Sequence, residues 1–259
     1  MELSQERKPK FLPRKTRMVM GVDPGQARDP CAVCVIEKCD GVIDNGSEWE
    51  RHTSQTAALG LQQKAERWRC VHIERLKLGT RYGDITRHVA SMLADPKLKR
   101  DPDSNRSACD LVLDFGGIGR AVAEDMLDAG LDPVCVNLTG GLETNWKRRH
   151  LYNVPKEEAV IQLDARIHHD RYPLTFSKHL TEADALKQEI ADFVRTVSGS
   201  GRMRYEARTG KHDDMVMALA ISVWFLLRPV QQPTVFGVYG SGDLGQSTFY
   251  ITKDGIKGV

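Results

Sequence analysis

One stretch of the sequence decides the fold: residues 210–227, which read GKHDDMVMALAISVWFLL. From residue 215 onward only Ser222 is polar, so a helix formed here is hydrophobic on every side and must lie inside the protein. An ionised carboxylate beside a buried helix needs a hydrogen-bonded partner, the helix N-terminus or a bound cation. Asp213 can serve as the N-cap, which leaves Asp214 to point outward from the first turn. The stretch therefore predicts a buried helix and raises the question of which other acids meet Asp214.

Two other acids stand at the ends of predicted strands. Residues 18–23 form a short apolar run that ends in Asp23, and a Pro-Gly turn follows it. Residues 31–38 predict the second strand of a hairpin, with Asp23 at its rim. Residues 109–114 predict a later strand that ends in Asp114. Open α/β sheets bind their ligands at the carboxyl ends of strands, so Asp114 is a candidate site residue as well.

The remaining pattern completes a mixed α/β chain with an antiparallel hairpin first and helices on both faces of the sheet. Further strands are predicted at residues 68–76, 134–138 and 203–207. Helices are predicted at residues 84–93, 118–127 and 155–168, and another is predicted with Leu186, Ile190, Phe193 and Val194 on its core face. Residues 39–67 are polar and predict an excursion from the hairpin. We divide the chain into a basic leader (1–17), one α/β domain (18–228) and a C-terminal tail (229–259).

The composition is that of an ordinary water-soluble domain. The 259 residues are 41% hydrophobic and 28% charged, and the net charge of +2 is too small to demonstrate a polyanionic partner. The most hydrophobic segment, residues 215–227, is too short to cross a bilayer, and we expect neither a membrane span nor a signal peptide. The six cysteines are expected to be reduced, because Cys31 and Cys34 point to opposite faces of one strand. This fits an intracellular protein.

The acids Asp23, Asp114, Asp213 and Asp214 are the candidate catalytic residues. Each lies at the end of an element, and a hairpin-first sheet with flanking helices can bring them together. Clustered carboxylates repel one another unless cations intervene, and oxygen ligands without neighbouring thiolates favour Mg²⁺ or Mn²⁺ over zinc. Two such ions about 4 Å apart would activate water and stabilise the leaving oxygen of a phosphodiester. Strand-end aspartates are also common turn formers, so a purely structural interpretation stays open.

A second group of candidate residues, Lys147, Arg148 and Arg149, follows Trp146 directly. A solvated loop is the simpler interpretation of residues 146–150, but cations beside an aromatic ring also form surfaces that contact phosphates. The basic run at residues 7–17 leaves the same choice, between a solvated tail and an arm that contacts nucleic acid.

Two other motifs carry little weight, and a third is absent. Residues 117–122, GIGRAV, resemble a dinucleotide fingerprint, but Val122 stands where the third glycine should be. Residues 114–116, DFG, resemble a kinase motif without its glycine-rich and catalytic loops. No P-loop motif occurs in the sequence, so no motor ATPase activity is expected of it.

Taken together, three segments resemble the nuclease domain of the large subunit of a tailed-phage terminase. They are GVDPG at residues 21–25 with Asp29, LDFGGIG at residues 113–119, and HDDMVMALA at residues 212–220. The resemblance runs from about residue 18 to residue 227. It implies a ribonuclease-H-like fold and a metal-dependent endodeoxyribonuclease that cuts concatemeric viral DNA during packaging. Asp23 and Asp114 would then be metal ligands, with Asp214, and Asp213 beside it, completing a site for two Mg²⁺ or Mn²⁺ ions.

The resemblance also implies partners and a location. These are double-stranded DNA, a packaging ATPase, a small terminase subunit and a portal, in the cytoplasm of a bacterial host. Relatives of this fold such as Holliday-junction resolvases often carry another acid one turn into the last helix, where this chain has Met217, so the third ligand is open. The alternatives are a resolvase-like nuclease, an actin-like phosphotransferase and a non-catalytic DNA-binding relative. Nucleotide binding would identify the second, and absence of cleavage with Mn²⁺ the third.

Overall fold

The computed structural model describes residues 10–26, 29–44, 63–100, 106–148, 150–177, 179–197, 203–207, 212–228, 249–252 and 255–258. The chain divides into two units, Met1–Leu227 and Arg228–Val259. Within the second unit the described residues form a small hairpin of β11 (Phe249–Thr252) and β12 (Gly255–Gly258). The division into leader, domain and tail remains a prediction, and residues 10–17 of the predicted leader belong to β1.

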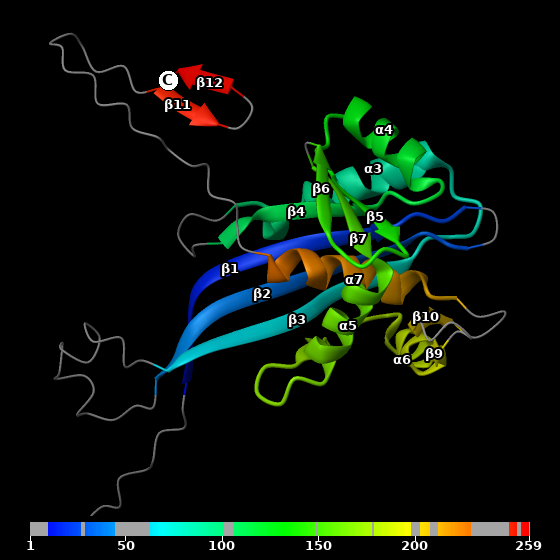
Figure 1. Ribbon diagram of the computed structural model, residues 1–259. Helices are drawn as coiled ribbons and strands as arrows, with labels where there is room; N and C mark the ends of the chain where they lie inside the picture. Colours follow the sequence, from blue (N-terminus) through cyan, green and yellow to red (C-terminus); the bar gives the residue numbers. More distant parts are fainter. Residues whose placement is uncertain are drawn as a thin grey trace, which may run out of the picture. The chain divides into compact units, whose positions relative to one another are not determined.

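An eight-stranded mixed sheet forms the centre of the first unit (Figure 1), with the strand order β6-β7-β5-β4-β1-β2-β3-β8. The first three strands are antiparallel, whereas β4 runs parallel to β1, β5 to β4, β7 to β5 and β8 to β3. Their bounds are β1 Lys10–Asp23, β2 Ala32–Asp44, β3 Lys64–Arg75, β4 Arg106–Asp114, β5 Val134–Thr139, β6 Asn145–Arg148, β7 Leu151–Pro155 and β8 Leu174–Phe176. The mixed sheet with an antiparallel hairpin first is confirmed.

Helices cover both faces of this sheet, as predicted (Figure 1). One face carries α3 (Tyr82–Leu93) and α4 (Gly119–Asp128), and a short 3₁₀ helix, η1 (Pro96–Leu98), follows α3. The other face carries α5 (Lys156–Ile167), α6 (Ala183–Asp192) and α7 (Asp214–Leu227). A separate pair of strands, β9 (Phe193–Val197) and β10 (Met203–Ala207), follows α6.

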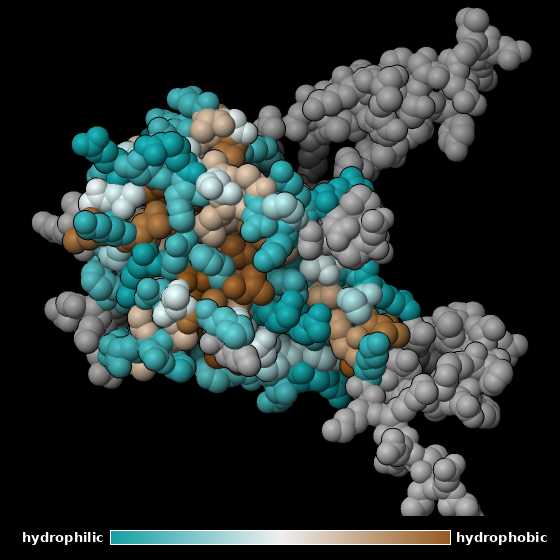
Figure 2. All heavy atoms as spheres, turned by 180° about the vertical axis from the view of Figure 1, so that it is seen from behind, coloured by the Kyte–Doolittle hydropathy of each residue, from teal (hydrophilic) through white to brown (hydrophobic). Residues whose placement is uncertain are grey.

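The alternation of side chains along each strand separates two hydrophobic cores. Val19 of β1 belongs to the core under α7, whereas Met20, the next residue, belongs to the core under α3 and α4. Cys34 and Cys31 divide in the same way, and all six cysteines are free thiols, as expected. Seen from behind the view of Figure 1, the described surface is largely hydrophilic, with hydrophobic side chains in small groups (Figure 2).

Helix α7 is the buried helix that the sequence predicted. Twelve of its residues are buried, and it packs across β1 and β2. Its one interior polar residue, Ser222, donates its hydroxyl to the Ala218 carbonyl at 2.8 Å, so the group is satisfied within the helix. At the other end, the Arg17 guanidinium donates to the Leu226 carbonyl at 3.2 Å. Among the described residues, no helix is both long and apolar enough to span a membrane.

Four sequence expectations about the elements were wrong. The helix expected to carry Phe193 and Val194 on its core face ends at Asp192, and Phe193–Val197 form β9, which pairs with β10. The first strand begins at Lys10 rather than at residue 18, because the β1–β2 ladder continues to the pair Lys10 and Asp44. The predicted excursion at residues 39–67 is shortened at both ends by β2 and β3, and residues 45–62 lie outside the described residues. Residues 145–148 form the edge strand β6 rather than a loop. In each case the strand is defined by main-chain hydrogen bonds to a neighbouring strand. The polarity of the side chains does not indicate this pairing.

The close contact between β1 and α7 depends on the absence of a side chain at Gly21. A Cβ built there would lie 2.0 Å from the Ser222 hydroxyl oxygen and 2.4 Å from the Ala218 carbonyl oxygen. We expect Gly21→Ala to lower the free energy of unfolding by about 3 kcal/mol, because the backbone of α7 must move to admit the methyl group. Urea denaturation followed by circular dichroism measures the change.

The matched control is Gly83→Ala in α3, where the nearest atoms to the added Cβ are the Asp125 carboxylate oxygens at 4.0 Å. This change should leave stability unchanged or raise it by up to about 1 kcal/mol, since alanine favours helix. Equal effects of the two substitutions would show that β1 and α7 are not held in close contact.

Candidate metal centre

The predicted acids lie at one edge of the sheet. Asp23 ends β1 and Asp114 ends β4, and these neighbouring strands are parallel with Val22 paired to Leu113. Both carboxylates therefore leave the sheet at the same edge, one strand spacing apart. Helix α7 packs on β1 and β4, and its N-terminus supplies Asp214. Three segments that are remote in sequence thus supply acids to one place.

The turn after β4 is fixed by a second close approach. A Cβ at Gly119 would lie 1.9 Å from the Asp114 carbonyl oxygen, so only glycine lets α4 begin this near the strand end. The Gly116 amide donates a hydrogen bond of 2.8 Å to Asp114 Oδ1. The glycines of residues 116–119 therefore position an acidic side chain and form a tight turn.

The acids influence one another's ionisation. Burial raises the pKa of Asp23 well above its usual value, and the negative charges of Asp114, Asp214 and Asp213 raise it further. The Lys156 ammonium opposes this shift in the pKa of Asp23. We call these four aspartates the acidic cluster.

Asp114 responds to the same surroundings. Burial raises the pKa of Asp114, and the Asp213 charge adds to the rise, while the Gly116 amide and the Lys156 ammonium lower it. The acidic cluster therefore resists full ionisation unless positive charge is supplied. The role of its members as metal ligands stays a prediction.

Adjacent residues of the cluster have different partners. Asp213 Oδ2 lies 3.0 Å from Lys156 Nζ in a half-exposed ion pair. Asp214 is only 4% exposed and lies near Arg75 Nε, at 3.7 Å from its Oδ2, and near His212 Nδ1, at 3.8 Å. The two carboxylates thus face different cations, one on each side of the helix start.

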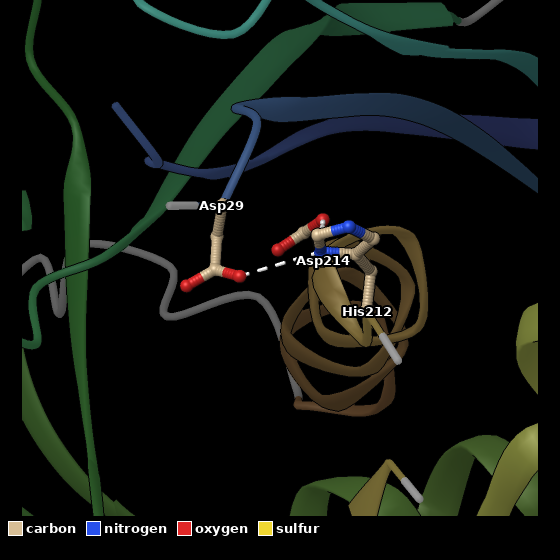
Figure 3. A group of neighbouring side chains, drawn as sticks. All are labelled: Asp29, His212 and Asp214. Carbon is tan, nitrogen blue, oxygen red and sulfur yellow. Dashed lines mark hydrogen bonds and ion pairs between the residues drawn. The ribbon is translucent and has the colours of Figure 1, made fainter. Parts of the chain in front are cut away.

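Asp29 and His212, two residues that the sequence analysis did not select as site residues, join Asp214 (Figure 3). One potential ligand atom from each of the three lies within 4.8 Å of the others. His212 Nδ1 is 3.3 Å from Asp29 Oδ1. Asp29 comes from the connection between β1 and β2, and His212 immediately precedes α7. Both residues lie in sequence segments that carry the resemblance to terminase nucleases, and this is the feature of the sequence by which they could have been selected.

The chemistry of these groups fits a divalent cation. Asp214 Oδ2 is buried and has no hydrogen-bond partner among the described residues, which is costly for a carboxylate oxygen. Burial raises the pKa of Asp214 to about 6, although His212 and Arg75 favour its ionised form. The nearby thiol of Cys31 is no competitor, because burial and the Asp23 charge raise its pKa to about 12. The donor set is therefore two carboxylate oxygens with one imidazole nitrogen. The carboxylates suit Mg²⁺ or Mn²⁺, and the imidazole also suits transition metals.

Glu189 of α6 fixes the start of α7. This side chain is 4% exposed, and its Oε1 accepts the Val216 amide at 2.8 Å, as an N-capping carboxylate does. Its Oε2 accepts from Arg75 of β3. Burial raises the pKa of Glu189 to about 7, and the Val216 amide and Arg75 oppose the rise. Glu189 and Arg75 thus connect α6 and β3 to the helix turn that carries Asp214.

The predicted DNA-binding residues lie apart from the acidic cluster. Lys147 is exposed on β6 beside Trp146, whose side chain is 58% exposed. Arg148 ends the same strand, and Arg149 lies outside the described residues. Strands β7 and β5 separate β6 from β4, which corresponds to about 14 Å at the usual strand spacing.

Removal of the Glu189 side chain should destabilise the first unit. We expect Glu189→Ala to lower the free energy of unfolding by about 2 kcal/mol, because α7 loses its cap and Arg75 loses its partner. Glu189→Gln, which keeps an acceptor for the Val216 amide, should have a smaller effect. Chemical denaturation measures both, and Glu124→Ala on the exposed face of α4 is the control, expected within about 0.5 kcal/mol of the parent. If Glu189→Ala resembles Glu124→Ala, the capping role is wrong.

Comparison with known proteins gives structural matches only. The sequence matches no protein-family model and no curated protein. The fold is similar to the large terminase nuclease of thermophilic phage G20c with bound magnesium, with a TM-score of 0.48 and 16% identity over 85% of this chain and 89% of that one. It is also similar to the large terminase nuclease domain of Thermus phage P74-26, with a TM-score of 0.47 and 16% identity over 80% and 78% of the two chains. The g2p large terminase nuclease domain of bacteriophage SPP1, with bound Mn, gives a TM-score of 0.41 and 10% identity over 82% and 87%.

Proposed function

We propose that this chain is a metal-dependent endodeoxyribonuclease, the nuclease domain of a phage terminase large subunit that cuts concatenated viral DNA for packaging. The observation that supports the proposal is the arrangement of acids at one end of the sheet: Asp23 and Asp114 end the neighbouring parallel strands β1 and β4, and α7, which begins at Asp214, packs on both. Proteins seldom bring this many carboxylates together without a cation to hold. The unsatisfied, buried oxygen of Asp214 points to the same need.

The proposed roles are those that the sequence predicts for the four aspartates. Asp23, Asp114 and Asp214, with Asp213 beside them, would hold two Mg²⁺ or Mn²⁺ ions. Such ions, when bound, activate a water molecule and stabilise the leaving oxygen of a phosphodiester. The strand ends of β1 and β4 and the capped start of α7 are rigid elements, so the protein contributes a preorganised arrangement of charge.

The proposed substrate is double-stranded DNA, and its backbone would extend from the acidic cluster to the basic residues near β6. Lys147, Arg148 and Arg149 could contact phosphates several nucleotides away from the cleaved bond, since duplex DNA carries one charge per about 1.7 Å of axis. A role in packaging would place the protein in the bacterial host cytoplasm with a packaging ATPase, a small terminase subunit and a portal. Because the sequence contains no P-loop, another chain or segment would supply the motor.

A plasmid-nicking assay tests the proposed activity. We expect relaxation of supercoiled DNA with Mn²⁺ and none with EDTA, and we expect Asp23→Ala or Asp114→Ala to lower the rate at least about 100-fold. Asp128→Ala, on the exposed end of α4, is the control and should keep the parental rate. Because each active-site change removes mutual repulsion, its free energy of unfolding in EDTA at pH 7 should be equal to or above that of the parent. Cleavage that survives both changes would refute the proposed activity.

DNA affinity tests the basic surface separately. We expect simultaneous alanine substitution of Lys147, Arg148 and Arg149 to weaken DNA binding and to reduce the slope of log K against log salt by up to about 0.9 per lost phosphate contact. Fluorescence anisotropy over a range of salt concentrations gives both values. Alanine substitution of Lys97, Lys99 and Arg100, three exposed basic residues around η1, is the matched control. If both triple variants have the same affinity and slope, the surface is elsewhere.

A further inference from the structure

Lys156 is a cation built into the acidic cluster. It is the first residue of α5 and directly follows Pro155, the last residue of β7. Its Nζ lies 3.0 Å from Asp213 Oδ2 and 6.0 Å from the centre of the Phe193 ring. The ammonium is therefore held between an acid and an aromatic face, at a point where β7 and α5 meet the start of α7.

Helix formation does not account for a lysine at this position. The N-terminus of a helix carries partial positive charge, which favours acids in the first turn and disfavours cations. Glu157 and Glu158, the next two residues, follow that rule and Lys156 breaks it. Departures from a local rule concentrate at functional sites, where another interaction compensates for them. Here the compensating interaction is with the acidic cluster.

The positive charge of Lys156 acts on one side of the cluster. It lowers the pKa of both Asp23 and Asp114 and pairs directly with Asp213. Asp214 instead faces Arg75 and His212, and its Oδ2 is left without a hydrogen bond among the described residues. Of the two adjacent aspartates, Asp213 has its carboxylate in a close ion pair with Lys156, whereas the buried Oδ2 of Asp214 has only longer contacts with Arg75 and His212.

We infer that Lys156 is a positioning residue that holds Asp213 in an ion pair. Of the two adjacent aspartates, Asp214 is therefore the one that ligates the metal. The inference rests on the proposed function, because it concerns the ions of that site. It assigns the third ligand, which the sequence left open between Asp213 and Asp214. It also means that the ammonium occupies part of the space in which the cluster attracts cations, so metal affinity is set below the value that the acids alone would give.

Mn²⁺ binding to the full chain without DNA, measured by isothermal titration calorimetry, tests the assignment. We expect Asp214→Asn to weaken Mn²⁺ binding about 100-fold or more, because a ligand is lost. Asp213→Asn should weaken it only about tenfold, which is the through-space effect of one nearby charge. Lys156→Met should tighten binding about tenfold, because one positive charge is removed and Asp213 is released.

The double variant Lys156→Met with Asp213→Asn has the same net charge as the parent and should bind Mn²⁺ within about threefold of it. Lys156→Arg should also stay near the parent, since it keeps the pair. Lys187→Met on α6, which removes a lysine from an exposed pair with Asp184, is the control and should have no effect. Thermal unfolding in EDTA identifies any variant that fails to fold, and the comparison of the two aspartate variants does not require Lys156→Met.

Two results would overturn the assignment while leaving the proposed nuclease in place: equal losses of Mn²⁺ affinity in Asp213→Asn and Asp214→Asn, or unchanged affinity in Lys156→Met. Absence of Mn²⁺ binding by the parent would instead contradict the proposed function itself, and the inference with it. The experiment therefore separates the failure of the positioning role from the failure of the metal site.

Discussion

The burial of α7 against β1 and β4 is the constraint on which the rest of the structure depends. A helix that is apolar on every side can lie only between a sheet and other helices, so α5 and α6 cover it. Its N-terminus then necessarily approaches the carboxyl ends of β1 and β4, which already carry Asp23 and Asp114. Hydrophobic packing thus supplies the free energy that holds mutually repelling acids together.

Basic side chains around the acidic cluster offset the repulsion between its carboxylates. Lys156 neutralises the side of the acidic cluster that contains Asp213, and Arg75 lies on the side that contains Asp214. Arg75 also pairs with Glu189, so the same guanidinium links the cluster to the cap of α7. Each of these residues comes from a different element, and the cluster is therefore a property of the assembled fold.

The sequence predicted the main elements, and with them the strand-end positions of Asp23 and Asp114, because these depend on local patterns. A few consecutive residues are enough to identify the apolar run after Asp214 and the strands that end in Asp23 and Asp114. The carboxyl ends of parallel strands lie at the same end of a sheet. Lys156 and Glu189 were not predicted as site neighbours, since their positions are set by packing between elements remote in sequence. The length of β1 was missed for a related reason: main-chain pairing extends it through residues whose side chains show no apolar alternation.

Asp213 directly precedes α7 and Asp214 is its first residue, and their carboxylates contact different cations, Lys156 for Asp213 and Arg75 for Asp214. Turning α7 about its long axis would move Asp214 relative to the ends of β1 and β4. The structure blocks such a turn at both ends, through the Glu189 cap at Val216 and the Arg17 contact at the Leu226 carbonyl. A helix held at both ends in this way keeps the Asp214 carboxylate at a fixed position relative to the two strand ends.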